Sequence, residues 1–105
     1  MTSDGYAVEI SQAADEDFRV ALAYYLRVAG RPSAEKFIAR YEDVIAYLET
    51  VPTAAAKIGA TGFRWLPVRS HILVYRIDEK TSKVYVARMH YGSSNWREQL
   101  EENAL

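Results

Sequence analysis

The stretch HILVYRIDEKTSKVYVARMHY, residues 71–91, consists of two apolar runs joined by four polar residues. Residues 71–78 and 83–91 are rich in β-branched and aromatic side chains, which favour strands. The intervening EKTS is polar and short enough to close a turn. The stretch therefore predicts an antiparallel β-hairpin.

Alternation along these strands distributes their side chains over two faces. In the second strand Val84, Val86, Arg88 and His90 are expected to oppose Tyr85, Ala87, Met89 and Tyr91, and in the first Ile72, Val74 and Arg76 oppose Leu73, Tyr75 and Ile77. Both faces are substantially apolar, and packed helices would bury one of them. The other face is either left exposed as a partner surface or covered by the C-terminal tail or the 53–62 loop.

The segments that flank the hairpin give three further predictions. FRWLPV (63–68) predicts a strand, and TAAAKIGATG (53–62) is small and flexible in composition, which predicts a loop. Beyond Gly92, SSNWREQLEENAL (93–105) predicts a short C-terminal helix capped by Ser94 or Asn95.

Two helices are predicted in the first half of the chain, after a short strand at YAVEI (6–10). Ser11 is a good N-cap for the first helix, and Gly30 and Pro32 mark its end and the start of the next. Pro52 ends the second helix. The apolar stripes are Phe18, Ala21, Leu22, Tyr25 and Ala29 in the first helix, and Phe37, Ile38, Tyr41, Val44, Ile45 and Leu48 in the second. The connection is short, so we expect an antiparallel helical hairpin.

The resulting order, β-α-α-β-β-β, predicts the α+β class. We expect the N-terminal helical hairpin to pack on one face of a small, mainly antiparallel sheet. A chain of 105 residues is expected to form one domain, over residues 1–105.

Composition excludes several classes of site. Half of the residues are apolar and 26% are charged, which is typical of a folded chain. No cysteine is present, so neither a disulfide framework nor a Cys-type zinc site can form, and His71 and His90 could at most contribute to a weaker metal site. We therefore expect no metal and no cofactor.

The expected location is the cytoplasm, without membrane contact. MTSDGYAVEI lacks the cationic start and apolar run of a secretory signal. No window approaches the roughly 18 apolar residues that a membrane span needs.

The net charge of −1 hides a division along the chain. Residues 1–56 carry −4, residues 57–97 carry +6 and the last eight residues carry −3. A basic segment can bind phosphate or an acidic partner, although such a run is also common on an ordinary solvated surface.

The order of elements and the residues in them resemble the RelE/ParE toxin superfamily of type II toxin–antitoxin systems over nearly the whole chain. The segments that carry the resemblance are ISQAADEDF (10–18), PSAEKFIARYEDVIAYLETVP (32–52), GFRWLPVRSHILVYRID (62–78) and VYVARMHYGSSNWREQL (84–100). The resemblance implies a cognate antitoxin as a separate chain and a hetero-oligomer with it.

Two activities occur in that superfamily. ParE-like members poison DNA gyrase and are not known to need a catalytic centre, whereas RelE- and YoeB-like members cleave messenger RNA on the ribosome. Cleavage by a ribose 2′-OH requires a general base, a general acid and cations at the developing phosphorane charge.

The end of the last strand, Arg88-Met89-His90-Tyr91, is similar to the Arg-x-His-Tyr ending of YoeB-like nucleases. The arginine that those nucleases carry on an earlier strand is replaced here by Ile72. Between Glu49 and Asp78 the chain has no acidic residue to act as a base. The nuclease alternative would therefore depend on Lys57, Arg88, His90 and Tyr91.

The tail GSSNWREQL (92–100) resembles the Gly-x-x-Asp-Trp tail of ParE-like members, with Asn95 at the aspartate. We therefore favour a ParE-like toxin that inhibits gyrase by binding, with no catalytic residue and no sequence-specific nucleic-acid contact. The alternatives are a ribosome-dependent messenger endoribonuclease and an inactive antitoxin-binding module. The residues expected to contact target or antitoxin are Arg64, Arg69, Arg88, Tyr91, Trp96 and Arg97.

Structural roles compete with these contacts. Arg88 could instead pair with a carboxylate of the second helix or the tail, and Tyr91 could pack with Tyr85 across strands. Trp96 is expected to anchor the tail, with its indole N–H bonded to an acceptor.

Overall fold

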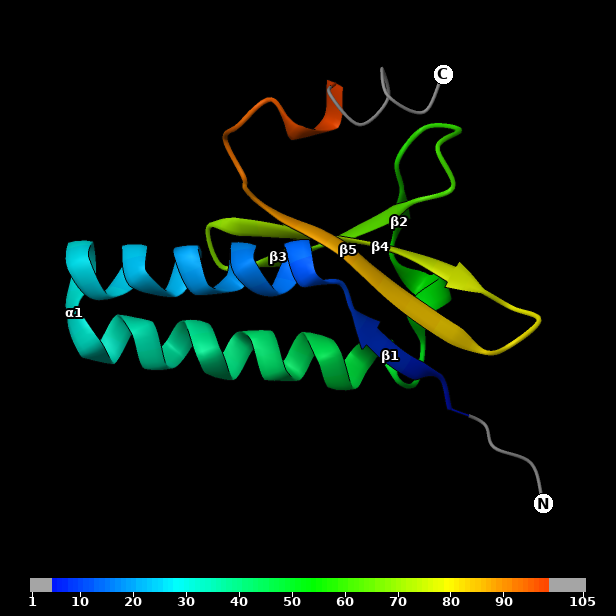
Figure 1. Ribbon diagram of the computed structural model, residues 1–105, viewed down its shortest axis with the longest axis horizontal. Coiled ribbons are helices and arrows are strands. Elements are labelled where there is room, and N and C mark those ends of the chain that lie inside the picture. The colour runs from blue at the N-terminus through cyan, green and yellow to red at the C-terminus, as the bar shows by residue number, and fades with distance from the viewer. Residues whose placement is uncertain (1–4, 99–105) are drawn as a thin grey trace.

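The structure, a computed structural model, describes residues 5–98 and has the predicted α+β architecture (Figure 1). Its elements are β1 (Ala7–Ile10), α1 (Gln12–Leu48), the 3-10 helix η1 (Pro52–Ala54), β2 (Ala56–Lys57), β3 (Arg64–Val68), β4 (His71–Asp78) and β5 (Lys83–Tyr91). Residues 96–98 are helical, and the remainder of the predicted C-terminal helix lies outside the described residues.

The strands form one mixed sheet in the order β1-β5-β4-β3-β2. The predicted hairpin is confirmed, because β4 and β5 pair antiparallel from His71↔Tyr91 to Asp78↔Lys83. The first strand pairs parallel with β5, over Ala7↔Lys83 to Ile10↔Val86. The hairpin therefore occupies the middle of the sheet, between β1 and β3.

Helix α1 is interrupted at Gly30, whose φ of 84° and ψ of 178° are not helical. The two arms on either side of Gly30 lie side by side and run in opposite directions (Figure 1). Ser11 caps the first arm as predicted, since its side chain accepts a hydrogen bond from the N–H of Ala14. A residue with a Cβ is strained in the backbone conformation of Gly30, so the chain reversal depends on this glycine.

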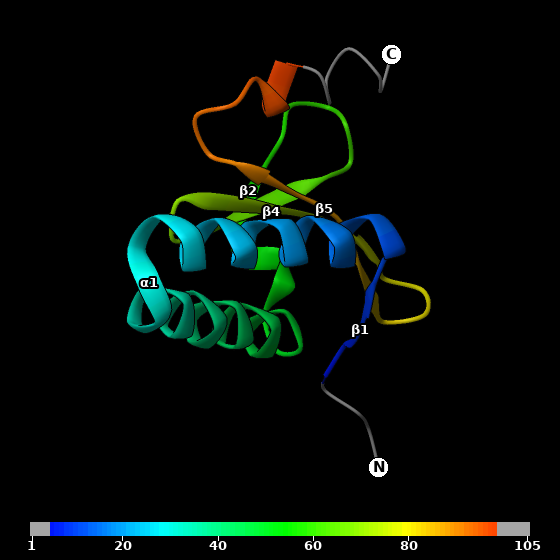
Figure 2. The same ribbon diagram turned by 60° about the vertical axis from the view of Figure 1, so that its left-hand side comes forward.

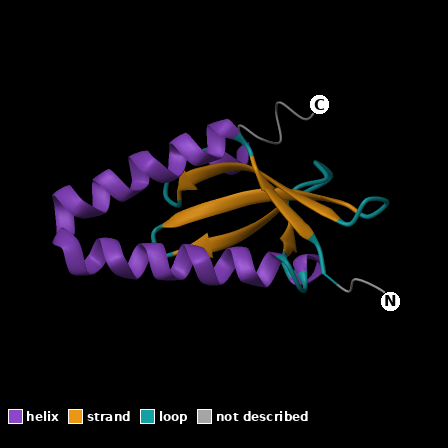
Figure 3. Cartoon of the chain, turned by 60° about the horizontal axis from the view of Figure 1, so that its bottom comes forward, coloured by secondary structure: helices purple, strands orange, loops and turns teal. Residues whose placement is uncertain are grey.

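Apolar side chains fill both faces of the sheet, in two separate clusters. Both arms of α1 run along the sheet (Figure 3). The larger cluster lies between α1 and the sheet and includes Phe37, Leu48, Leu73 and Tyr75, all with exposed fractions of 0%.

The smaller cluster lies on the opposite face, which we call the far face, and consists of Ile58, Ile72, Val74 and Trp96 with Phe63 and Trp65 packed against it. The loop before β3 and the segment after β5 lie on this side of the sheet (Figure 2). Of the two alternatives, coverage by loop and tail therefore holds for this part of the far face.

The predicted face assignment of β5 is wrong beyond Val86, because of a β-bulge. Val74 pairs with Arg88 while the next residue of β4, Tyr75, pairs with Val86, so Ala87 is the extra residue. One inserted residue reverses the alternation that follows it. Met89 therefore joins Val84 and Val86 in the larger cluster, which regular alternation had placed on opposite faces.

The predicted 53–62 loop contains the end of η1 and the extra edge strand β2, so this prediction is wrong in part. Backbone carbonyls of the segment accept hydrogen bonds from two side chains of the sheet. The Tyr75 hydroxyl donates to Pro52 O at 2.6 Å, and the Arg64 guanidinium donates to Thr53 O at 2.9 Å and Ala55 O at 2.7 Å. These bonds tie η1 and the residue after it to β3 and β4, although the local composition predicts a flexible loop.

Replacing Gly30 by Ala is expected to lower the free energy of unfolding by about 1–3 kcal/mol, because the new Cβ is strained in this backbone conformation. Ala23→Ser, an exposed change on the same arm, is expected to change it by about 0.5 kcal/mol or less. Urea unfolding followed by circular dichroism measures both. Equal stability of the Gly30→Ala variant and the parent chain would show that the reversal does not depend on glycine.

Candidate functional site

The end of β5 is the place where the helical layer, the sheet and the tail meet. Beyond Val86, β1 no longer pairs with the outer edge of β5, and the start of α1 takes its place. Ser11 donates from its backbone N–H to Val86 O at 3.0 Å and from Oγ to Ala87 O at 2.9 Å. Ser11 thus caps the helix and also provides hydrogen-bond donors for two backbone carbonyls at the edge of β5.

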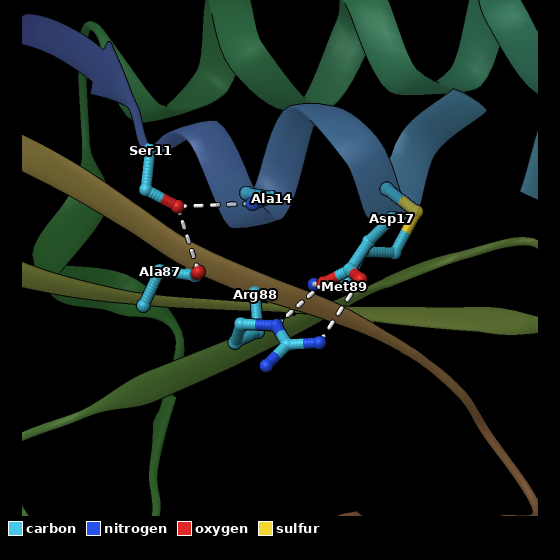
Figure 4. A network of polar contacts seen from close by, with 6 residues as sticks. All are labelled: Ser11, Ala14, Asp17, Ala87, Arg88 and Met89. Atoms are coloured by element: carbon cyan, nitrogen blue, oxygen red, sulfur yellow. Dashed lines mark hydrogen bonds and ion pairs between the residues drawn. The ribbon is translucent and has the colours of Figure 1, made fainter. Parts of the chain in front are cut away.

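Asp17, about one and two-thirds turns further along α1, continues this edge contact (Figure 4). Its carboxylate accepts hydrogen bonds from Arg88 Nε at 2.7 Å, from Arg88 Nη2 at 3.0 Å and from the backbone N–H of Met89 at 3.0 Å. We call the contacts of Ser11 and Asp17 with residues 86–89 the edge latch. The bulge at Ala87 lies inside the latch.

The carboxylate of Asp17 is held in its charged form. Burial alone would raise its pKa, but the hydrogen bonds from Arg88 and Met89 outweigh this effect and the pKa lies below the ordinary 3.8. Within the described residues Arg88 therefore pairs with Asp17 on the first arm of α1, whereas the expected structural role named a carboxylate of the second helix or the tail. Its side chain remains 51% exposed, so part of the guanidinium faces solvent.

Tyr91 closes an aromatic cluster on the helical side of the sheet. Its ring lies 5.4 Å from that of His71 and 6.0 Å from that of Tyr24. His71 is buried, its Nδ1 lies 3.3 Å from the Tyr25 hydroxyl, and burial lowers its pKa below 6.5. The expected packing of Tyr91 with Tyr85 is wrong, because the bulge places the two rings on opposite faces.

An exposed apolar patch adjoins this cluster on α1. Val20 and Val28 are 71% and 60% exposed, and they lie one helical turn on either side of Tyr24. We call Val20, Tyr24, Val28 and Tyr91 the α1 patch; Tyr91 itself is 44% exposed. Arg27 lies beside the α1 patch, three residues after Tyr24 on the same helix, and its positive charge acts on the Tyr24 hydroxyl.

His90 and the tail lie on the far face. The His90 ring stacks on that of Trp96 at 6.4 Å and 12°, and Trp96 is buried as expected for an anchor. The Arg97 guanidinium lies 5.5 Å from the centre of the Trp65 ring and 5.1 Å from that of Trp96. A hollow of about 390 Å³ adjoins these side chains, lined also by Ile72 and Gly92.

The residues of the nuclease alternative are not gathered at one place. Lys57 is on β2, three strands from β5 in the sheet order. Tyr91 faces α1, whereas His90 faces Trp96 on the far face. Within residues 5–98, no group of three or more His, Asp or Glu side chains is arranged to hold a metal ion.

Of the remaining predicted contacts, Arg64 lies apart from the end of β5, whereas Arg69 lies in the turn next to it, where the Gly92 N–H donates to Ser70 O at 2.8 Å. The Arg64 guanidinium donates hydrogen bonds to backbone carbonyls of the η1 segment, so its observed role is structural. Arg69 is exposed in the turn between β3 and β4, with a φ of 57°. No helix in the described part of the chain is long and apolar enough to cross a membrane.

Sequence reasoning missed Asp17 as a structural residue and the α1 patch as a surface. Asp17 carries no local signal, because its partners are 71 and 72 residues away. The α1 patch does carry one: Val20, Tyr24 and Val28 repeat at four-residue spacing beside the predicted core stripe. Two apolar stripes on one amphipathic helix indicate a second contact surface.

Comparison with known proteins identifies a family. The family model described as ParE toxin of type II toxin–antitoxin system, parDE, matches residues 8–96. Among curated proteins, no sequence matches the chain.

Solved toxin structures have the same fold. A chromosomal ParDE toxin–antitoxin system from P. aeruginosa superposes with a TM-score of 0.67 at 16% identity, covering 82% of this chain and 95% of that one. The RelBE2 toxin–antitoxin complex from Mycobacterium tuberculosis gives 0.56 at 20% identity, covering 83% and 98%. The isolated E. coli RelE toxin gives 0.53 at 16% identity, covering 95% and 99%. At these identities the likeness shows the fold alone.

Replacing Asp17 by Asn is expected to lower the free energy of unfolding by about 1–2 kcal/mol at neutral pH. The change removes charge-assisted hydrogen bonds at a partly buried group, and the exposure of Arg88 limits the loss. Asp15→Asn is the matched control, because Asp15 pairs with Arg19 at 2.9 Å on the exposed surface of the same arm. Its expected effect is about 0.5 kcal/mol or less.

The effect of Asp17→Asn is also expected to depend on pH. Because the folded-state pKa of Asp17 lies below 3.8, its contribution is present above that value and is lost as the pH falls through the folded-state pKa. Urea unfolding at a series of acidic pH values measures how the difference between parent and variant shrinks. A pH-independent difference, or an equal effect of Asp15→Asn, contradicts the latch.

Proposed function

The chain belongs to the family of ParE toxins of type II toxin–antitoxin systems, and we propose that it inhibits DNA gyrase by binding and is neutralised by a cognate antitoxin. The toxin would act in the cytoplasm, where it would hold gyrase together with cleaved DNA. No bond is made or broken by the toxin itself in this mechanism.

The separation of the nuclease candidates supports binding over cleavage. Acid–base cleavage needs its groups within hydrogen-bond reach of one reacting phosphate. Lys57 lies three strands from β5, which corresponds to roughly 14 Å at strand spacing. Tyr91 and His90 lie on opposite faces of the sheet, so they would not meet at one substrate.

The protonation state of His90 also supports binding over cleavage. Burial lowers its pKa below 6.5 and the neighbouring Arg88 lowers it further, against an opposing effect of Asp17. A histidine in this state is mostly uncharged at neutral pH and is a poor proton donor for a leaving group. Its stacking on Trp96 indicates a packing role.

The α1 patch is the surface that we propose for the antitoxin. Its apolar side chains repeat along one helix, and Tyr91 packs beside the middle one, Tyr24, which suits an amphipathic partner helix laid along α1. Arg27 beside the patch favours an acidic residue in the partner. A separate antitoxin chain agrees with the toxin–antitoxin assemblies among the structural neighbours.

Purified protein is expected to block supercoiling by gyrase and to increase the amount of cleaved DNA. Relaxed and linear plasmid forms on a gel measure both effects, and His90→Ala is expected to retain them, because no proton transfer is involved. Messenger cleavage in a translating extract that is lost in His90→Ala would support a ribonuclease instead. Inactivity in both assays would leave an antitoxin-binding module.

Replacing Val20 by Asp is expected to weaken binding of the antitoxin at least about tenfold, because a charge replaces an apolar contact. Val51→Asp is the matched control, since Val51 is also exposed, at 47%, but lies beyond the end of α1. Calorimetric titration with the purified antitoxin measures both. Equal affinities of the two variants would place the antitoxin elsewhere.

A further inference from the structure

The far face carries two pairs of guanidinium and aromatic groups. In one, Arg97 lies over Trp65 and Trp96 at 5.5 and 5.1 Å. In the other, Arg76 lies 4.4 Å from the centre of the Tyr85 ring. Both arginines are exposed, and a guanidinium held over a ring can also stack on a further planar group.

Each pair lies beside a hollow. The Trp65 and Arg97 pair lines the hollow of about 390 Å³, and the Tyr85 and Arg76 pair lines one of about 300 Å³ with Ile10 and Ala87. Glu9 also lines the second hollow, but its carboxylate lies 3.4 Å from the ammonium group of Lys83. Glu98 lines the first hollow with Arg97. Among the ion pairs of the described residues, neither Arg76 nor Arg97 takes part.

The spacing of the two hollows fits a chain-like ligand. On β4, Ile72 lines the first and Arg76 the second, and four residues of strand correspond to about 13 Å. Stacked nucleotides of one strand rise by about 3.4 Å each, so roughly four would reach from one hollow to the other. Binding sites of four or more nucleotides are typical of single-strand binding folds.

We propose that the far face binds single-stranded nucleic acid without sequence preference. Unpaired bases would stack on the guanidinium planes and on the exposed parts of Trp65 and Tyr85, and phosphates would lie against Arg76 and Arg97. A duplex keeps its bases stacked inside and cannot use these platforms. An acidic peptide offers the charge without a planar group at each position.

This function goes beyond the proposed inhibition of gyrase and lies on the face opposite the α1 patch. It needs neither gyrase nor antitoxin, so its test uses the purified chain alone. A negative result in that test would not change the expected result of the supercoiling assay. A negative supercoiling assay would likewise not change the expected binding of single strands.

The experiment is fluorescence anisotropy with labelled single-stranded DNA and RNA of about 12 nucleotides at low salt. The double variant Arg76→Gln/Arg97→Gln is expected to lower affinity at least about tenfold. The matched control is Arg19→Gln/Arg31→Gln, because both arginines are exposed on α1, at 75% and 85%. Its affinity is expected to stay within about twofold of the parent chain.

Two further measurements separate stacking from charge. Trp65 and Trp96 are the only tryptophans in the chain, so quenching of intrinsic fluorescence on binding reports bases at the first hollow. An abasic strand and a duplex of the same length are expected to bind more weakly. Far-ultraviolet circular dichroism confirms that each variant is folded.

Several results would overturn the proposal. The first is that neither single strand binds. The second is that the abasic strand or the duplex binds as tightly as the intact single strand. The third is that the Arg19→Gln/Arg31→Gln control loses as much affinity as the Arg76→Gln/Arg97→Gln variant. Displacement of the oligonucleotide by polyglutamate at matched charge would assign the face to an acidic peptide. Preference between the DNA and RNA strands identifies which nucleic acid the face binds.

Discussion

The outer edge of β5 has to be satisfied by two different elements. Its first four residues pair with β1, and beyond Val86 the edge would present unpaired backbone groups. The edge latch provides the missing partners, with Ser11 bonded to two carbonyls and Asp17 to the N–H of Met89. Because both residues belong to the start of α1, this contact fixes where the helix leaves the sheet and hence which face it covers.

The main features of this fold can be predicted from local patterns. Alternation and β-branched residues give the hairpin, and Ser11 and Gly30 mark positions where the backbone changes direction. The bulge at Ala87, the strand β2 and the latch cannot be predicted this way. Each depends on a specific partner in another element: Arg64 bonds the η1 segment from 11 and 9 residues away, and Arg88 bonds Asp17 from 71 residues away. Local sequence patterns do not identify those partners.

The candidate surfaces show the same division. The burial of Trp96 was predicted correctly, because a large aromatic residue in a polar tail is expected to pack against the fold. The face of each residue in 87–91 was not predictable, since one extra residue exchanges the two sides. The bulge thus directs Tyr91 toward α1 and His90 toward the tail. Two neighbouring residues thereby belong to surfaces that separate partners could occupy.

The parallel pairing of β1 with β5 also imposes an order on folding. Ala7 and Lys83 are partners in the sheet although 76 positions separate them in the chain, and contacts of this kind slow folding. During synthesis the helices and the hairpin can form from nearby residues, but β1 must wait until β5 has been made. The latch closes at the same late stage, because Arg88 and Met89 follow that segment. The surfaces at the end of β5 are therefore assembled only when almost the whole described chain is present.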